Sequence, residues 1–198
     1  MKLLYIILAV FAFSACSTTV PSVAEYRINT DAKPQAFTQS ACRENSLKVA
    51  QAFSPSSLMS LNMNYGQGDH KQFVFTQSQW AQSPNNAITA ELLKSIKATK
   101  LFKNVQVSKS RSNNSLLLET SIEDFMQYFS EDESSSYVSV VVTLTLIDTN
   151  SNRVLATETF SSKMDVLSVN ASGGVTALNE ALQNVLEDGV LWFGEVCR

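Results

Sequence analysis

The side chains of this sequence that could do chemistry are few and widely spaced. The single histidine, His70, lies in the polar stretch GQGDHKQ, with no cysteine or second histidine at metal-binding spacing. The series that starts at Asp148 resembles a calcium loop, but Arg153 stands where glycine should make the turn and Thr159 where a glutamate should close the site. No nucleophile elbow or glycine-rich phosphate loop occurs. We therefore expect a solvated loop at His70, a hairpin turn after Asp148, and no catalytic residue, metal or cofactor.

Cys16 is the exception, because its surroundings predict a covalent modification. An unbroken apolar run over residues 3–13 follows the positive charge of Lys2, and it is too short to span a bilayer. The sequence Phe-Ser-Ala-Cys resembles the bacterial lipobox, in which the signal peptide is cut before the cysteine and the cysteine is acylated. The sequence therefore predicts a signal peptide over residues 1–15 and an acyl (palmitate-type) anchor on Cys16. Ordinary cleavage that leaves an incidental thiol is the alternative.

The residues that follow Cys16 predict where the anchor is held. Ser17, rather than an aspartate, comes next, and in the sorting pattern familiar from enteric bacteria this implies the outer membrane. The small, polar and proline-containing stretch STTVPSVA indicates a flexible tether over residues 16–24, ahead of a single domain over residues 25–198. Because each buried acyl CH₂ contributes about 0.8 kcal/mol, a three-chain anchor holds a protein to its membrane almost permanently.

The two remaining cysteines lie near opposite ends of the predicted domain. Cys42 is close to its start and Cys197 is the penultimate residue, and the oxidising periplasm permits a bridge between them. Closing a loop of about 155 residues would cost the unfolded chain roughly 5 kcal/mol of entropy in the polymer model. We expect the disulfide; two reduced thiols are the alternative.

Composition narrows the class of protein. Only 6 Gly, 4 Pro and 17% charged residues are typical of a globular domain. The formal net charge is −3 and no block of Lys or Arg is present to neutralise phosphates, which argues against nucleic acid as a ligand. The longest later apolar run, residues 138–147, is interrupted by polar residues and is not a membrane span.

The centre of the chain gives the strongest β signal. The even positions Leu116, Leu118, Ile122 and Met126 are apolar, and even positions are apolar again over residues 138–147, where they alternate with Ser and Thr. The acidic stretch SEDESSS separates these two strands, and the turn after Asp148 leads to a third over residues 153–160. Shorter strands are expected over residues 26–28, 46–53, 58–65, 72–76 and 104–108.

Two helices are expected beside these strands. Ser83 offers an N-cap followed by Pro84 at the first helical position, and apolar residues then recur every four positions to near Lys100. Ser172 is the expected N-cap of the last helix, which carries a broad apolar stripe over residues 175–193. Because a sheet with one apolar face needs a covering layer, we predict an α/β (α+β) domain: an antiparallel-rich mixed sheet packed on one face by two helices.

Five apolar side chains are candidates for contact with a partner. Trp80 precedes the first predicted helix in polar surroundings, and packing under the helix entrance is its alternative interpretation. The other four cluster at the end of a predicted hairpin and put apolar groups on both faces of one strand, more than a one-sided core needs. They are Phe125, Met126, Tyr128 and Phe129, and core packing is their alternative too.

The order of these pieces resembles the ABC-type transport auxiliary lipoprotein family. Its members are periplasmic partners of mammalian-cell-entry (MCE) type lipid transport systems, including the Pqi group. The resemblance implies a fold like the N-terminal domain of TolB-like proteins. The positions that match the family pattern are Cys16, Tyr26-Arg27-Ile28, Trp80-Ala81 with Pro84, Phe102 to Val105, Asp148 with Arg153-Val154-Leu155, and Val175 to Leu186.

The resulting hypothesis is a non-catalytic accessory subunit, anchored through Cys16 on the periplasmic face of the outer membrane. There it would bind an MCE protein that reaches across from the inner-membrane transporter, and it would form a ring-like homo-oligomer if that partner is itself a ring. Two alternatives stay open: a domain that carries phospholipid in an apolar pocket beneath its helices, and a TolB-like structural lipoprotein in envelope assembly or secretion.

Overall fold

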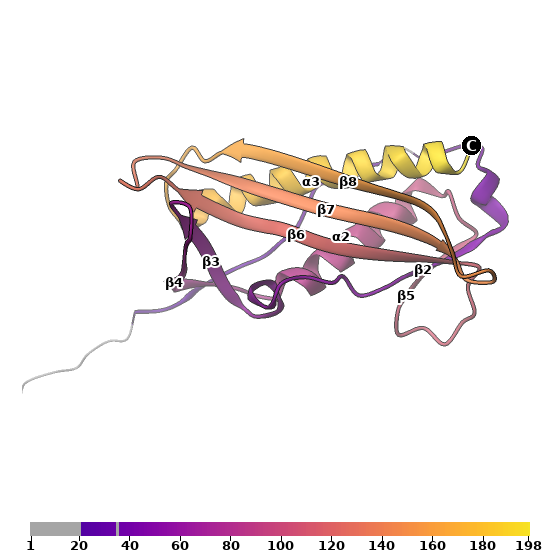
Figure 1. Ribbon diagram of the computed structural model, residues 1–198, viewed down its shortest axis with the longest axis horizontal. Coiled ribbons are helices and arrows are strands. Elements are labelled where there is room, and N and C mark those ends of the chain that lie inside the picture. The colour runs from indigo at the N-terminus through magenta and orange to yellow at the C-terminus, as the bar shows by residue number, and fades with distance from the viewer. Residues whose placement is uncertain (1–20, 35) are drawn as a thin grey trace, which may run out of the picture.

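Three long strands in the second half of the chain form the body of an eight-stranded sheet (Figure 1). The computed structural model describes residues 21–34 and 36–198. Strands β6 (Leu116–Phe129), β7 (Ser136–Asp148) and β8 (Arg153–Asp165) are joined by two turns and pair antiparallel along their whole length. The predicted third strand over residues 153–160 is therefore correct in place but five residues too short at its end.

The free edge of β6 is shared by two short parallel strands. Strand β2 (Ser46–Val49) pairs with the first half of β6, and β3 (Asn62–Gln67) pairs with its second half. Strand β5 (Asn104–Val107) continues the sheet beyond β2. Beyond β3 come β4 (Lys71–Trp80) and then β1 (Ala24–Tyr26). The sheet is mixed and its long pairings are antiparallel, which confirms the predicted fold class.

The short elements differ from their predicted bounds. Residues 58–65 were expected to be one strand, but Ser56–Met59 forms a 3-10 helix (η2) and β3 begins only at Asn62. The first strand lies at Ala24–Tyr26 rather than over residues 26–28. A second 3-10 helix, η1 (Ala41–Glu44), which the sequence pattern did not indicate, precedes β2. Short elements have too few residues for periodicity to set their ends.

Helix α2 (Pro84–Thr99) begins as predicted, with Ser83 at the N-cap and Pro84 at the first helical position. The Ser83 hydroxyl makes no capping bond to a helix N–H; it accepts a hydrogen bond from the Asn86 side chain at 2.7 Å. The helix ends where Lys100 adopts a left-handed conformation, with φ of 58°. The sequence signal at the start of this helix is therefore correct, although the capping bond is not the one expected.

Helix α3 (Ala171–Val196) begins before its predicted cap. Asn170, not Ser172, is the N-cap, and its side-chain oxygen accepts a hydrogen bond from the Gly173 N–H at 2.9 Å. Asn and Ser are both favoured N-caps, so the sequence alone offered two candidates two residues apart. The prediction of Ser172 is wrong, and the helix starts earlier.

Both helices cover the same face of the sheet (Figure 1). Helix α3 packs on β7 and β8, and α2 packs on β5 and against α3. The layer between helices and sheet is filled by aliphatic and aromatic side chains that are almost completely buried. They include Leu47, Ile88, Leu92, Ile96, Leu118, Ile122, Leu144, Leu146, Leu182 and Phe193.

A β-bulge in β6 changes which side chains face this core. Even positions point inward from Leu116 to Ile122, as predicted, but the register with β7 shifts between Ile122 and Asp124. After the shift Phe125 and Gln127 are buried, and Met126 lies on the opposite face. The expected inward position of Met126 is wrong, because one extra residue in a strand reverses the alternation that follows it.

The predicted signal peptide over residues 1–15, Cys16 and the first part of the tether lie outside the described residues. Within residues 21–34 and 36–198, none of the helices is both long and apolar enough to cross a membrane.

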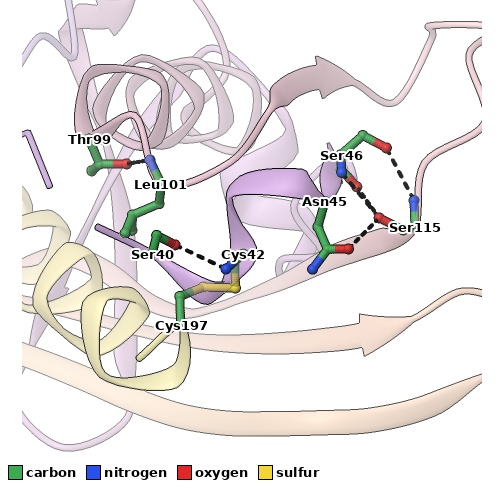
Figure 2. The surroundings of a disulfide bond; sticks show 8 residues. All are labelled: Ser40, Cys42, Asn45, Ser46, Thr99, Leu101, Ser115 and Cys197. Atoms are coloured by element: carbon green, nitrogen blue, oxygen red, sulfur yellow. Dashed lines mark hydrogen bonds between the residues drawn. A yellow bond between two sulfur atoms is a disulfide. The ribbon is translucent and has the colours of Figure 1, made fainter. Parts of the chain in front are cut away.

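A disulfide joins the segment before β2 to the C-terminal end of the chain (Figure 2). Cys42 in η1 is bonded to Cys197, the residue after α3, across a sequence separation of 155 residues. The Ala41 N–H donates to the Cys197 carbonyl at 2.7 Å, and the Ser40 hydroxyl accepts from the Cys42 N–H at 3.1 Å. The bridge expected from the sequence is present, and it fastens η1 to the end of α3.

Replacing both cysteines, Cys42→Ser with Cys197→Ser, should lower the free energy of unfolding by about 2–5 kcal/mol, since removal of a long-range crosslink frees the unfolded chain. Urea unfolding followed by circular dichroism measures the loss. The parent protein under reducing conditions should show the same loss, whereas the variant should not respond to reductant. An unchanged unfolding midpoint in both comparisons would contradict a stabilising role for the bridge.

Candidate interaction surface at one end of the sheet

The five predicted contact residues lie near one end of the sheet, but the structure divides them among three environments. Trp80 ends β4, and the other four occupy the last five positions of β6. The bulge between Ile122 and Asp124 turns these four alternately toward the core and away from it.

Trp80 and Phe125 belong to the core. They are 4% and 3% exposed, and their ring centroids lie 5.8 Å apart. A partner could not reach either ring without opening the domain. The structure therefore agrees with the alternative interpretation, in which Trp80 packs beneath the entrance of α2, and it removes both residues from the candidate surface.

Met126 and Tyr128 lie on the face of the sheet that the helices leave open. The Tyr128 ring stacks on Tyr137 of β7, with centroids 5.2 Å apart and ring planes at 17°. The Lys163 Nζ of β8 lies 3.6 Å from the centre of the Tyr137 ring, a cation–π contact. These residues form a row across three neighbouring strands, which we call the open-face row: Met126, Tyr128, Tyr137 and Lys163.

The Tyr128 ring is held in place from two sides. Its hydroxyl donates to the Asp124 Oδ1 at 2.9 Å. Across the strand pair, Gly66 of β3 lies beneath the ring, and a Cβ at that position would approach the Tyr128 Cδ1 to 2.6 Å. Glycine is required here because any side chain would displace the tyrosine. The ring therefore has a fixed place on the open face.

Partial burial is the largest influence on the pKa values of Asp124 and Tyr128. Removal from water raises the pKa of the Asp124 carboxyl above its ordinary value, although hydrogen bonds from Ser139 and Tyr128 oppose the shift. Burial, and next to it the negative charge of Asp124, raises the pKa of the Tyr128 hydroxyl as well. The phenol therefore stays protonated and remains a hydrogen-bond donor at neutral pH.

Phe129 belongs to a second aromatic cluster, which the sequence pattern did not indicate. The Tyr65 ring lies at the centre of it, with centroids 5.5 Å from Phe73, 4.5 Å from Phe75 and 5.2 Å from Phe129. Phe73 is 42% exposed, and the other three rings are partly covered. We call this cluster the aromatic tip: Tyr65, Phe73, Phe75 and Phe129.

One sequence signal for the aromatic tip was available. Phe73 and Phe75 are two residues apart in a predicted strand, so both rings had to share a face. The pairing of β3 with both β4 and β6 brings Tyr65 and Phe129 to them. Nothing in local periodicity reports that register, because it is set by strand pairing between distant segments.

The residues weighed for catalysis or metal binding do not come together. His70 is an exposed residue of the β3–β4 turn. Asp148 begins the β7–β8 turn, where its carboxylate accepts from the backbone N–H groups of Asn150 and Ser151, so the hairpin turn is confirmed. Over the described ranges, no group of three or more His, Cys, Asp or Glu side chains could hold a metal ion.

The helix layer offers little room for a lipid. Its interior is occupied by the buried side chains described above. A groove runs outside this layer, between α2 and the β2–β5 edge, and its wall mixes apolar side chains with amide and hydroxyl groups. It lies outside the helix layer, so it is not the apolar pocket beneath the helices that the lipid-carrying alternative predicts. Its lining includes Gln51, Gln82, Asn86, Thr89, Leu93 and Val107.

Because the pKa of Asp124 is raised, we expect Asp124→Asn to stabilise the folded protein by an amount that depends on pH. A carboxyl with a raised folded-state pKa contributes stability below its unfolded value, near 3.8, and loses that contribution as pH rises through the folded value. The variant should therefore melt higher than the parent at pH 7, and the difference should vanish near pH 3. We expect a rise of no more than about 4 °C, because the carboxyl is still partly solvated.

Asp132→Asn is the matched control of opposite sign. Asp132 lies in the exposed β6–β7 turn, and hydrogen bonds from Ser130 and Ser134 lower its pKa to about 2. The ionised Asp132 stabilises the folded state at any pH above its unfolded-state pKa, and this stabilisation is lost as pH falls through the folded-state pKa. The variant lacks it and should therefore melt lower than the parent at pH 7. Calorimetry at pH 3 and pH 7 measures both. Equal melting temperatures for Asp124→Asn and the parent at pH 7 would show that the ionised, partly buried Asp124 carboxylate does not destabilise the fold.

Comparison with solved structures gives the same fold at low identity. Protein XCC0632 from Xanthomonas campestris has a TM-score of 0.76 at 16% identity, over 87% of this chain and 96% of that one. An uncharacterized protein has a TM-score of 0.65 at 11% identity, over 86% and 98% of the two chains. The hypothetical protein CT253 from Chlamydia trachomatis has a TM-score of 0.50 at 10% identity, over 78% and 98%. At these identities the likeness shows the fold alone.

Sequence comparison identifies the family. No curated protein matches the sequence. The family model for the ABC-type transport auxiliary lipoprotein component matches residues 26–188, which run from the end of β1 into α3. This match spans strands β2 to β8 and most of α3, and it confirms the resemblance found in the sequence. The chain belongs to the family of ABC-type transport auxiliary lipoprotein components.

Proposed function

We propose that this protein is a non-catalytic, lipid-anchored subunit of an MCE-type ABC lipid transport system, held on the periplasmic face of the outer membrane. The observation that carries the proposal is the family match over residues 26–188, since that family is described as a lipoprotein component auxiliary to ABC-type transport. Family membership accounts for an envelope location, a membrane anchor and a transporter as partner. The MCE system and the outer membrane are the finer parts of the proposal.

The anchor follows from the residues before the described domain. Cys16 precedes Ala24, the first residue of β1, by eight positions. Eight extended residues span at most about 28 Å, so an acylated Cys16 keeps Ala24 within about that distance of the bilayer. The domain then contributes location and an interface, while an ATPase elsewhere in the system supplies the energy.

The open-face row is the surface proposed to contact the transporter partner. The helices do not cover it, and it presents aromatic, thioether and ammonium groups near one another on three neighbouring strands. Tyr and Met are enriched at protein interfaces because they combine large contact area with adaptable packing. Of the five residues predicted from the sequence, Met126 and Tyr128 are the two that stand on this surface.

The anchor is tested by Cys16→Ser. The variant should incorporate no radiolabelled palmitate and should leave the membrane fraction, because the thiol that is acylated is gone. Ser17→Asp is the matched control: it should keep the label but move from the outer-membrane to the inner-membrane fraction. Equal labelling of the parent and Cys16→Ser would contradict acylation at this residue.

The partner surface is tested by Tyr128→Ala combined with Met126→Ala. Binding to a co-purified MCE protein should weaken about 10–30-fold, because truncating a central aromatic contact costs about 2 kcal/mol. Leu191→Ala, at a 62% exposed position on α3, is the control and should bind as the parent does. Since the tyrosine stack is worth about 0.5–1.5 kcal/mol, melting temperatures must show that both variants are folded. Undiminished co-purification of the double variant would rule out the open-face row as the contact surface.

A further inference from the structure

The end of the sheet that carries the aromatic tip also carries the most exposed apolar side chain of the described residues. Leu167, in the loop between β8 and α3, is 101% exposed, and Val169 in the same loop is 36% exposed. Phe73 of the aromatic tip is 42% exposed. Exposed apolar side chains that lie next to one another on a surface can mark a contact site for something apolar.

Hydrogen bonds and strand register join this loop to the aromatic tip. The Val166 N–H donates to the Ser136 carbonyl at 2.9 Å, and Ser136 pairs with Phe129 at the end of β6. Phe129 in turn pairs with Gln67 at the end of β3. In Figure 1 the β3–β4 hairpin, the β6–β7 turn and the loop before α3 all lie at the left end, opposite the C-terminus.

The direction of β1 brings the anchored end of the chain to the same end of the sheet. Strand β1 is parallel to β4, with Ala24 beside Ser78 and Tyr26 beside Trp80. The residues that precede β1 therefore approach from the side of β4 on which Phe73 and Phe75 lie. The described chain begins at this end in Figure 1, and an acylated Cys16 lies within about 28 Å of Ala24.

We propose that the aromatic tip and Leu167 insert into the interfacial layer of the bilayer that holds the anchor. The domain would then stand on the membrane on this end, with the open-face row directed sideways and its C-terminal end away from the lipid. Aromatic rings and leucine partition favourably into the boundary between headgroups and acyl chains. This inference rests on the proposed anchor at Cys16 but assigns a second, non-covalent membrane contact to the domain itself.

The charges around the tip define the lipid that it fits. Its turns carry Asp69, Glu131, Asp132 and Glu133, against Lys71, whose Nζ lies 3.5 Å from the Glu131 Oε2. Acidic turns are repelled by anionic headgroups, so the contact must be driven by the apolar side chains and fits a zwitterionic lipid surface. Raising the anionic lipid content should therefore weaken the insertion, unlike that of a basic membrane-binding surface.

The chain offers a clean labelling experiment. With Cys16 acylated and Cys42 bonded to Cys197, a single introduced cysteine is the one free thiol of the mature protein. Leu167→Cys, labelled with a polarity-sensitive fluorophore, tests the tip without disturbing packing, because the leucine is fully exposed. Leu191→Cys, 62% exposed near the other end of α3, is the matched control.

The full acylated protein is reconstituted in phosphatidylcholine vesicles, with and without brominated phosphatidylcholine as a quencher. The label at position 167 should shift to shorter wavelength and lose most of its emission to the brominated lipid, and both effects should shrink when phosphatidylglycerol is added. The label at position 191 should respond to neither. A second variant, Phe73→Ser in the Leu167→Cys background, should reduce the quenching.

Other results separate this inference from the proposed function. Flotation with the vesicles but equal, weak quenching at positions 167 and 191 would overturn the inserted tip and leave the anchor intact. A shift at position 167 that requires added MCE protein would also overturn it, in favour of a protein contact. Failure to float would contradict the anchor at Cys16, and with it this inference.

Discussion

The exclusion of water from one face of the β6–β7 hairpin is the constraint on which the rest of the structure depends. Most of its inward positions are occupied by aliphatic side chains that are almost completely buried. Burying each such side chain contributes about 1.5–3 kcal/mol, but an isolated hairpin has nothing against which to bury it. Helices α2 and α3 supply that surface, and they do so on one face only. The opposite face is consequently free for other contacts.

The bulge in β6 determines which side chains lie on this open face. Without the register shift between Ile122 and Asp124, Met126 would point into the core and Phe125 would be exposed. With it, Phe125 completes the core beside Trp80, and Tyr128 stands on the open face above Gly66. One inserted residue thus places some apolar side chains at the end of β6 in the core and others on the open face. Bulges often redirect side chains in this way near functional surfaces.

The shared edge of β6 gives the domain two different ends. The β2–β5 arm and η1 lie toward the end that the Cys42–Cys197 bridge closes, where η1 is tied to the last residues of α3 (Figure 2). The β3–β4–β1 arm lies toward the end where the described chain begins and the aromatic tip is exposed. One end of the domain is therefore crosslinked, and the other exposes aromatic rings. The polarity is a property of the topology, because both arms pair with one strand.

The sequence by itself determined the elements with long, regular patterns and the chemistry of single residues. The β6–β7 alternation, the Ser83-Pro84 start of α2 and the stripe of α3 can all be read locally, because periodicity and capping act within a few turns or pleats. Only the tertiary structure decided what Met126, Trp80 and Phe129 do. Their surroundings depend on a bulge and on strand register between segments far apart in the chain, and neither leaves a local pattern to read.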